Sequence, residues 1–159
     1  MARAVIADTG PLIAFAGIDR LSILRSLFSE VSITESVKAE CLVKTGLDAQ
    51  RIDAALGEGW LVSVPVEKRL PPLSPSLGIG ESDSIRFASQ AQGESLPIVD
   101  DRLARRYALQ KGLDIVGTVR LLDLAEQRGL MESAESYIRE MSGFGYHISA
   151  ALLQRLRQD

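Results

Sequence analysis

Four carboxylates spread along the chain could do chemistry together: Asp8, Glu40, Glu81 and Asp101. Packed side by side without a cation, they would repel one another and some would take up protons. A divalent ion resolves that conflict, and Mg²⁺ or Mn²⁺ prefers oxygen ligands while keeping several of its waters. The set therefore predicts a metal site, provided that the fold brings the four acids together.

Other kinds of catalytic side chain are scarce. The chain of 159 residues has a single histidine, His147, and a single cysteine, Cys41. One histidine excludes a two-histidine ribonuclease and argues against a serine–histidine triad, so we interpret His147 as structural or as a surface residue. One cysteine excludes an internal disulfide and a Cys-based zinc site. Catalysis would then depend on carboxylates, hydroxyls, Lys or Arg, or on a bound ion.

Two of the four acids follow short apolar segments that indicate buried strands. Asp8 comes after Ala4–Ala7, and Asp101 comes after Leu96–Val99, with Asp100 beside it. Ligands of open parallel sheets bind beyond the carboxyl ends of the strands, so both acids are well placed. Each could equally cap the helix that follows, although two acids in series exceed what one cap requires.

The two glutamates stand on helices. Glu81 opens a helix, where the helix dipole alone favours an acid by about 0.3–1 kcal/mol. Glu40 lies at the edge of an apolar face formed by Val37 and Cys41, and a carboxylate there needs a partner because burial of a lone charge is costly. Such a carboxylate is coordinated to an ion, hydrogen-bonded, or paired with a positive charge, an arginine elsewhere in the chain being the alternative to an ion.

The elements that must position these acids are short apolar strands alternating with helices. Strands are expected at 4–7, 31–33, 60–64, 96–99 and 114–116, and helices at 11–16, 19–28, 34–41, 48–56, 81–92, 102–111, 118–128, 133–141 and 149–157. Segment 65–80, with its four prolines, indicates a loop inside one domain. This alternation predicts an α/β fold with a mostly parallel sheet.

The composition is that of a globular protein, with 46% hydrophobic and 25% charged residues. We expect a single domain over residues 1–159, whose C-terminal helices at about 132–159 pack on it or on a dimer partner. We find no signal peptide and no apolar run of roughly 20 residues, so we expect a cytoplasmic protein. The net charge of −3 does not indicate nucleic-acid binding, but it does not describe a local groove either.

The sequence resembles the PIN-domain nucleases, in particular the small prokaryotic branch (DUF3368-like) often paired with antitoxins. The resembling segments are VIADTGPLIAF, ITESVKAE, LGIGESDSIRFA, and LPIVDDRLARRYA running on to LDIVGTVRLL. The resemblance implies a PIN-like three-layer α/β/α fold and an Mg²⁺- or Mn²⁺-dependent ribonuclease that hydrolyses RNA phosphodiester bonds. It also implies the toxin of a type II toxin–antitoxin pair, a small antitoxin as partner, and a homodimer.

Carried over to this chain, the resemblance makes Asp8, Glu40, Glu81 and Asp101 the catalytic and metal-binding residues. Asp8 and Asp101 are expected as the main ligands, and the two glutamates are expected to hold waters. Many relatives have Asp where this chain has Glu81. Thr9, Asp83 and Asp100 are additional candidates, Thr9 because the family often places a hydroxyl near the metal water.

An RNA substrate requires phosphate contacts as well as a metal. Arg102, Arg105 and Arg106 can share one face of the helix after Asp101, and we take them as the first candidates, followed by Lys44 and Arg120. The alternative is an ordinary solvated face. Aromatic residues make up 5% of the chain, which argues against an extensive base-stacking platform.

Two other functions were weighed. A haloacid-dehalogenase-like phosphatase also begins with a strand-end Asp, but it requires a second Asp where this chain has Gly10, and it requires a Lys that segment 83–109 lacks. A PIN-like module that binds RNA or protein without cutting would usually have lost one or more of the acids. All four are present, which favours a nuclease.

Overall fold

A computed structural model describes residues 3–43, 45–66, 70–91 and 94–146. Within these residues, four strands and eight helices follow one another. The strands are β1 (Ala4–Ala7), β2 (Val31–Thr34), β3 (Leu61–Val64) and β4 (Ser95–Ile98). The helices are α1 (Thr9–Gly17), α2 (Leu21–Phe28), α3 (Glu35–Leu42), α4 (Leu47–Glu58), α5 (Ile79–Gln90), α6 (Arg102–Gln110), α7 (Thr118–Gln127) and α8 (Ala134–Gly143).

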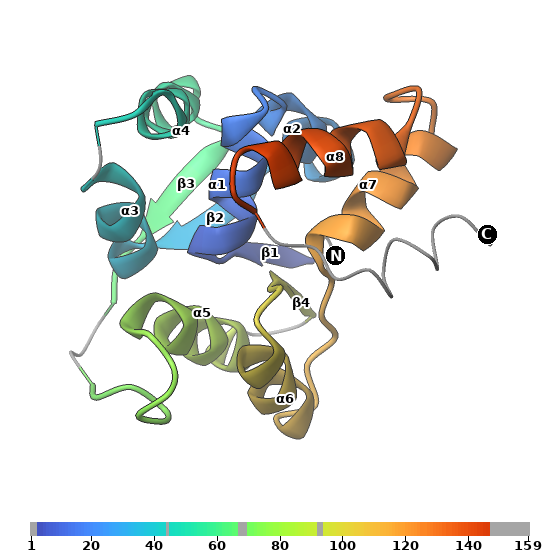
Figure 1. Ribbon diagram of the computed structural model, residues 1–159. Coiled ribbons are helices and arrows are strands. Elements are labelled where there is room, and N and C mark those ends of the chain that lie inside the picture. The colour runs from blue at the N-terminus through green and yellow to red at the C-terminus, as the bar shows by residue number, and fades with distance from the viewer. Residues whose placement is uncertain (1–2, 44, 67–69, 92–93, 147–159) are drawn as a thin grey trace.

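The four strands form one parallel sheet in the order β3-β2-β1-β4. The chain adds β2 and β3 on one side of β1 and then returns to place β4 on the other side. Helices α5 and α6 cover one face of the sheet, and α1, α2, α7 and α8 lie on the opposite face (Figure 1). This is the three-layer α/β/α fold that the sequence predicts.

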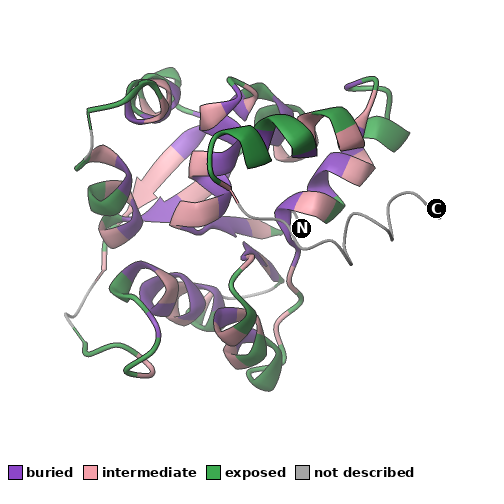
Figure 2. Ribbon diagram, in the orientation of Figure 1, coloured by how far each residue is buried: buried purple, intermediate pink, exposed green. Residues whose placement is uncertain are grey.

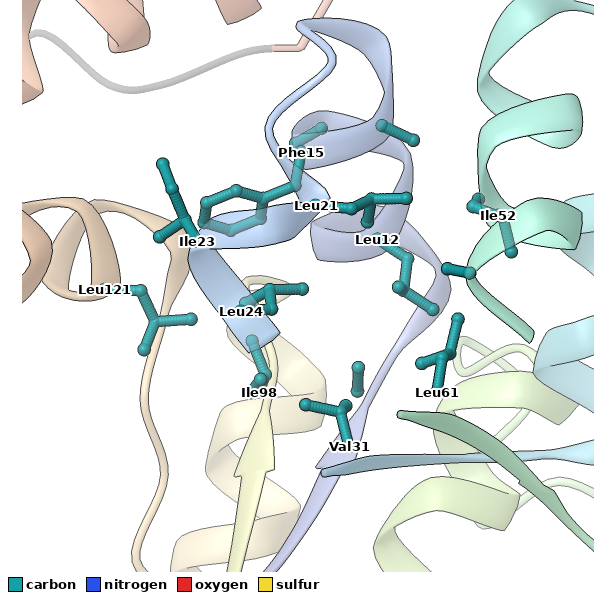
Figure 3. Close-up of a cluster of buried hydrophobic side chains, with 14 of the residues drawn as sticks. Leu12, Phe15, Leu21, Ile23, Leu24, Val31, Ile52, Leu61, Ile98 and Leu121 are labelled. Atoms are coloured by element: carbon teal, nitrogen blue, oxygen red, sulfur yellow. The ribbon is translucent and has the colours of Figure 1, made fainter. Parts of the chain in front are cut away.

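Apolar packing holds the helices on the sheet. Figure 3 shows Phe15 of α1 and Leu24 of α2 close to Ile98 of β4, and each of these side chains is fully buried. Burial of such a side chain stabilises the fold by about 1.5–3 kcal/mol. A smaller cluster lies around α5 and α6 and contains Leu77, Ile85, Val99, Ala104 and Ala108. The helices turn buried residues toward the sheet and exposed ones outward (Figure 2).

Local signals explain several element boundaries. Thr34 caps α3 as predicted, because its Oγ1 accepts a hydrogen bond from the Val37 N–H at 3.3 Å. Helix α4 ends at Gly59, whose φ of +86° lies in the left-handed region that glycine adopts without strain. Pro11 lies in the first turn of α1, where its missing N–H has no intrahelical partner to lose.

The predicted strand at 114–116 is wrong as a full strand. Only Val116 pairs with the sheet, in an isolated parallel bridge to Ile98. The Val116 N–H donates to the Pro97 carbonyl, and its carbonyl accepts from the Val99 N–H. Asp114 instead pairs with Arg3 at 2.8 Å at the edge of the molecule. The Leu113 N–H still belongs to the turn after α6, since it donates to the Ala108 carbonyl at 3.1 Å, and Thr118 already begins α7.

Some predictions fall outside the described residues, namely the helix at 149–157, the interpretation of His147, and Lys44 as an RNA contact. In the segments that the structure describes, no helix is long and apolar enough to cross a membrane.

Candidate active site

The strand order places the candidate site. β1 and β4 are neighbours, with Ala7 in register with Ile98, and the chain reverses its direction of strand addition between them. In open α/β sheets, ligands bind outside the carboxyl ends of the strands at such a switch point. Asp8 follows β1 and Asp100 follows β4, so both acids stand at this crevice.

A cavity of about 330 Å³ opens at the crevice, and it brings the four predicted acids together. Its walls are Asp8, Thr9, Gly10, Pro11, Glu40, Glu81, Asp100, Asp101 and Tyr146. Five of these side chains are carboxylates, and no lining residue among those described is a Lys, Arg or His. The cavity is therefore a concentration of negative charge with no basic side chain in its walls.

Asp8 is the most deeply buried of the acids, with 5% of its surface exposed. It occupies the N-cap position of α1, but its side chain makes no capping hydrogen bond, and its Oδ1 has no hydrogen-bond partner. Burial raises the pKa of Asp8 to about 7, and the charges of Glu81, Glu40 and Asp100 add to the shift. The capping explanation for Asp8 is therefore not supported.

Glu40 reaches the cavity from α3. Its Oε2 accepts a hydrogen bond from the Thr9 hydroxyl at 2.5 Å, and its Oε1 accepts one from the Gly80 N–H at 3.0 Å. The close approach depends on Gly80, because a Cβ there would lie 2.6 Å from Glu40 Oε2 and would displace that carboxylate. Glu40 is exposed and held by these two groups, and no arginine among the described residues pairs with it.

Glu81 combines both roles that its sequence position suggested. Its Oε1 accepts from the Gly78 N–H at 3.4 Å at the start of α5, whereas its Oε2 is buried without a partner. Burial raises the pKa of Glu81, and the nearby Asp101 carboxylate raises it further. One oxygen of Glu81 supports the helix, and the buried carboxyl lies close to that of Asp101, with which it also interacts.

The adjacent acids Asp100 and Asp101 differ in their surroundings. Asp101 is exposed, and its Oδ2 caps α6 by accepting from the Ala104 N–H at 2.9 Å. Asp100 is half-buried, and its Oδ1 accepts from the Thr118 N–H at 2.8 Å. Its Oδ2 accepts from the hydroxyls of Thr118, at 2.5 Å, and of Tyr146. Burial raises the pKa of Asp100, while the Thr118 hydrogen bonds and the charge of Arg105 oppose that shift.

Thr118 and Tyr146 belong to the site, although the sequence analysis did not select them. Thr118 opens α7 directly after Gly117, as Thr9 opens α1 after Asp8, and that similarity is a signal that could have identified it. A Cβ at position 117 would lie 2.8 Å from Asp100 Oδ1. Tyr146 follows α8 and contacts Asp100 across 46 positions, which no local pattern indicates.

Asp83, one of the additional candidate ligands, does not lie with the four acids. Its side chain is buried, but it lines a different cavity, of about 660 Å³, together with Thr34, Val64 and Arg86. Its Oδ1 lies 3.7 Å from Arg86 Nη1. Asp83 follows Glu81 by two residues on α5, and residues two apart on a helix do not share a face.

The predicted RNA-binding arginines are also in different environments. Arg102 and Arg106 are exposed on α6, the helix that begins directly after Asp101 of the acid cavity. Arg105 is half-buried next to Asp100 and Gly117. Arg120 pairs with Asp123 at 2.6 Å on α7. Among the described candidates, Arg102 and Arg106 are therefore the best placed for RNA phosphates.

The residues of the cavity fit a hydrated divalent ion. Asp8 Oδ1 and Glu81 Oε2 are buried carboxylate oxygens without partners, and the remaining acidic donors are also oxygens. In the described part of the chain, no three His, Cys, Asp or Glu side chains form a ready-made metal cluster. Mg²⁺ commonly binds one or two carboxylates and keeps several waters, so two orphaned oxygens satisfy its needs.

The fold and this cavity define an α/β domain with an acidic site at the switch point of a parallel sheet. A family model described as a PIN domain (DUF3368) matches residues 4–159. The chain belongs to the PIN-domain family. PIN domains are generally nucleases and typically use divalent metal ions.

A solved structure supports the fold. The PilT N-terminus domain protein SSO1118 from the hyperthermophilic archaeon Sulfolobus solfataricus P2 is similar to this chain, with a TM-score of 0.53 and 24% sequence identity. The match covers 77% of this chain and 92% of that one. No curated protein matches the chain.

Proposed function

We propose that the chain is a ribonuclease that hydrolyses RNA phosphodiester bonds with the help of Mg²⁺ or Mn²⁺. Asp8 carries the proposal: it is buried, has an unpartnered oxygen and a pKa raised to about 7, and faces other carboxylates. Such a carboxyl is only about half ionised at neutral pH, and a bound cation would supply the missing partner and favour its charged form. Membership of a family of nucleases supports phosphodiester hydrolysis as the reaction.

In this proposal, Asp8 Oδ1 and Glu81 Oε2 hold the ion, and Asp101 contributes through its Oδ1, which the helix cap leaves free. This changes the order expected from sequence, because Glu81 now precedes Asp101 as a ligand. The bound ion supplies positive charge for the scissile phosphate and lowers the pKa of water.

The remaining acids act through their positions. Thr9 and Gly80 fix both oxygens of Glu40, so this carboxylate can orient the attacking water and accept its proton. Thr118 and Tyr146 hold Asp100 against the wall of the acid cavity. The exposed Arg102 and Arg106 contact RNA phosphates beside the cavity.

The resemblance to small prokaryotic PIN nucleases extends the proposal to the toxin of a type II pair, with a small antitoxin as partner and a homodimer as the assembly. Expression of the chain would then slow bacterial growth, and an Asp8→Asn variant would not. Normal growth with the wild-type chain, despite cleavage in vitro, would contradict the toxin role and leave the nuclease proposal unaffected.

The direct test is cleavage of varied labelled RNAs by purified protein with Mn²⁺ or Mg²⁺. Asp8→Asn is expected to lower the rate by at least about 100-fold, and Asp53→Asn, an exposed change on α4, is the matched control with no expected effect. If the wild-type protein leaves all RNAs intact, the chain is a silent PIN-like module that binds RNA or protein. Cleavage that survives Asp8→Asn combined with Asp101→Asn would indicate a contaminant.

A further inference from the structure

A second cavity, which we call the apolar groove, lies beside the acid cavity. It has a volume of about 550 Å³ and runs between α1, α4 and the end of α8. Ile13 lines it from α1, Leu47 from α4, and Phe144 from the end of α8. Pockets for small organic groups commonly have this size and a mostly apolar lining. The groove is therefore large enough for one flat heterocycle and its sugar.

Phe144 gives the groove an exposed aromatic wall, with 72% of its surface accessible. Its backbone is nevertheless fixed, because the N–H groups of Phe144 and Tyr146 both donate to the Met141 carbonyl, at 3.1 and 3.0 Å. Gly145 makes this turn possible with a φ of +92°. A ring presented on an ordered turn loses little freedom when it stacks on a ligand.

The groove and the acid cavity share a wall. Tyr146 lines both, and its hydroxyl donates to Asp100. Helix α1 also passes from one to the other: Thr9 lines the acid cavity and Ile13 lines the groove. A molecule with a charged group at the acids and an apolar group a few ångströms away would therefore reach both cavities.

We propose that the apolar groove binds one nucleobase of the RNA strand, next to the phosphate held at the acid cavity. The proposal rests on the proposed nuclease function and adds a subsite to it. Every base has a face that stacks on an aromatic ring, and one such contact changes affinity about 5- to 150-fold.

Two polar groups at the groove can contact the edge of the base. Arg51 is anchored by hydrogen bonds to the Ala16 and Gly17 carbonyls, at 2.8 and 3.2 Å, so its guanidinium is held in place. Asp48 uses Oδ1 to accept from the Ala49 N–H, which leaves Oδ2 able to accept from a base amino group. With aromatic residues at 5% of the chain, the groove serves one base and not a run of bases.

Nuclear magnetic resonance of the ¹⁵N-labelled protein with Mg²⁺ tests the groove directly, using AMP, GMP, CMP and UMP as probes and ribose 5-phosphate as the probe without a base. The nucleotides are expected to shift the amide signals of Gly17, Leu47 and Gly145, and ribose 5-phosphate is expected to leave them in place. Phe144→Ala should weaken nucleotide binding at least about fivefold. Leu109→Ala, which removes a side chain of α6 that is 60% exposed, should not.

Several outcomes would overturn the base subsite. The first is that the amide signals of the groove do not move with any nucleotide. The second is that ribose 5-phosphate shifts them equally. The third is that Phe144→Ala and Leu109→Ala weaken nucleotide binding equally. A dimer that becomes a monomer in Phe144→Ala, without nucleotide shifts, would instead make the groove a contact between copies of the chain.

RNA cleavage separates failure of the subsite from failure of the nuclease proposal. Removal of the base beside the scissile phosphate should slow cleavage by the wild-type protein at least about fivefold, and it should have little further effect in Phe144→Ala. If nucleotides shift the groove signals but no RNA is cut, the nuclease proposal fails and the base subsite stands. If RNA is cut and the two changes act independently, the base subsite fails and the nuclease proposal stands.

Discussion

Two aspartates of this fold are buried to nearly the same extent, Asp8 with 5% and Asp83 with 6% of its surface exposed. Asp83 has its countercharge on the same helix, because Arg86 Nη1 lies 3.7 Å from its Oδ1. Asp8 has an oxygen without a partner, and its neighbours across the acid cavity are further carboxylates. Burial is therefore equal in the two regions, while charge compensation is not.

The difference indicates that Asp83 has a structural role as part of an ion pair, whereas Asp8 has a carboxylate oxygen that a ligand could use. A buried ion pair contributes little net stability, but removal of one partner is destabilising because the other charge is stranded. An uncompensated buried carboxyl has the opposite property, since its ionisation works against the folded state. The two aspartates should consequently respond in opposite directions to the same substitution.

The largest effect is expected for Asp8→Asn in the metal-free protein. The folded pKa of about 7 exceeds the usual value of 3.8, so between these values the folded protein holds a proton that the unfolded chain has released. Stability therefore falls as pH rises from about 4 to about 7. The neutral Asn removes that loss and should raise the free energy of unfolding by up to roughly 4 kcal/mol at pH 8, with little change at pH 4.

Urea denaturation in EDTA at the two pH values measures this effect. Addition of Mg²⁺ serves as the control, because the ion should stabilise the wild-type protein and leave Asp8→Asn nearly unchanged. A variant that is less stable than wild type at pH 8 would show that Asp8 already has its partner within the fold.

Asp83→Asn should act in the opposite direction. The change leaves the Arg86 guanidinium, whose side chain is 18% exposed, without its countercharge. The free energy of unfolding is expected to fall by about 3 kcal/mol, measured by the same urea titration. The stabilisation by Mg²⁺ should persist, because Asp83 does not line the acid cavity. If Mg²⁺ no longer stabilised a folded Asp83→Asn protein, Asp83 would also contribute to ion binding, and the proposed difference between the two aspartates would be wrong.

Gly80→Ala tests the arrangement inside the acid cavity with a smaller effect. The new methyl group would lie 2.6 Å from Glu40 Oε2 and displace that carboxylate. Cleavage of RNA is expected to slow by about 10- to 100-fold, because small misplacements at a reacting centre are costly. Gly57→Ala on α4 is the matched control, since its Cβ would meet open space and should stabilise the helix by about 0.5–1 kcal/mol.

Sequence patterns predicted the strands and most helices because each depends on local signals. The place of Asp8 beyond β1 also followed from such a pattern. The Asp83–Arg86 pair could have been predicted as well, since residues three apart share a helix face. The single bridge at Val116 could not, because an apolar run does not state how many of its residues will find a partner.

The parts of the site that escaped prediction depend on how the chain turns after a strand or helix. Sequence patterns favoured Asp101 over Asp100 but did not show that Asp100 contacts Thr118, because the backbone path after β4 decides which of the two faces that residue. Tyr146 reaches Asp100 through the turn at Gly145. The partners of Glu40 come from α1 and α5, so its helix position could show the need for a partner but not identify it.

The strand order also has a consequence for folding during translation. β1 is made first and β4 last, yet the two are neighbours, so a growing chain on the ribosome can assemble β1, β2 and β3 while Asp8 still lacks its opposite wall. Asp100, Thr118 and Tyr146 arrive only with the C-terminal 60 residues of the chain. Domains fold as units while they are synthesised, so the acid cavity is complete only near the end of translation, when Tyr146 has been made.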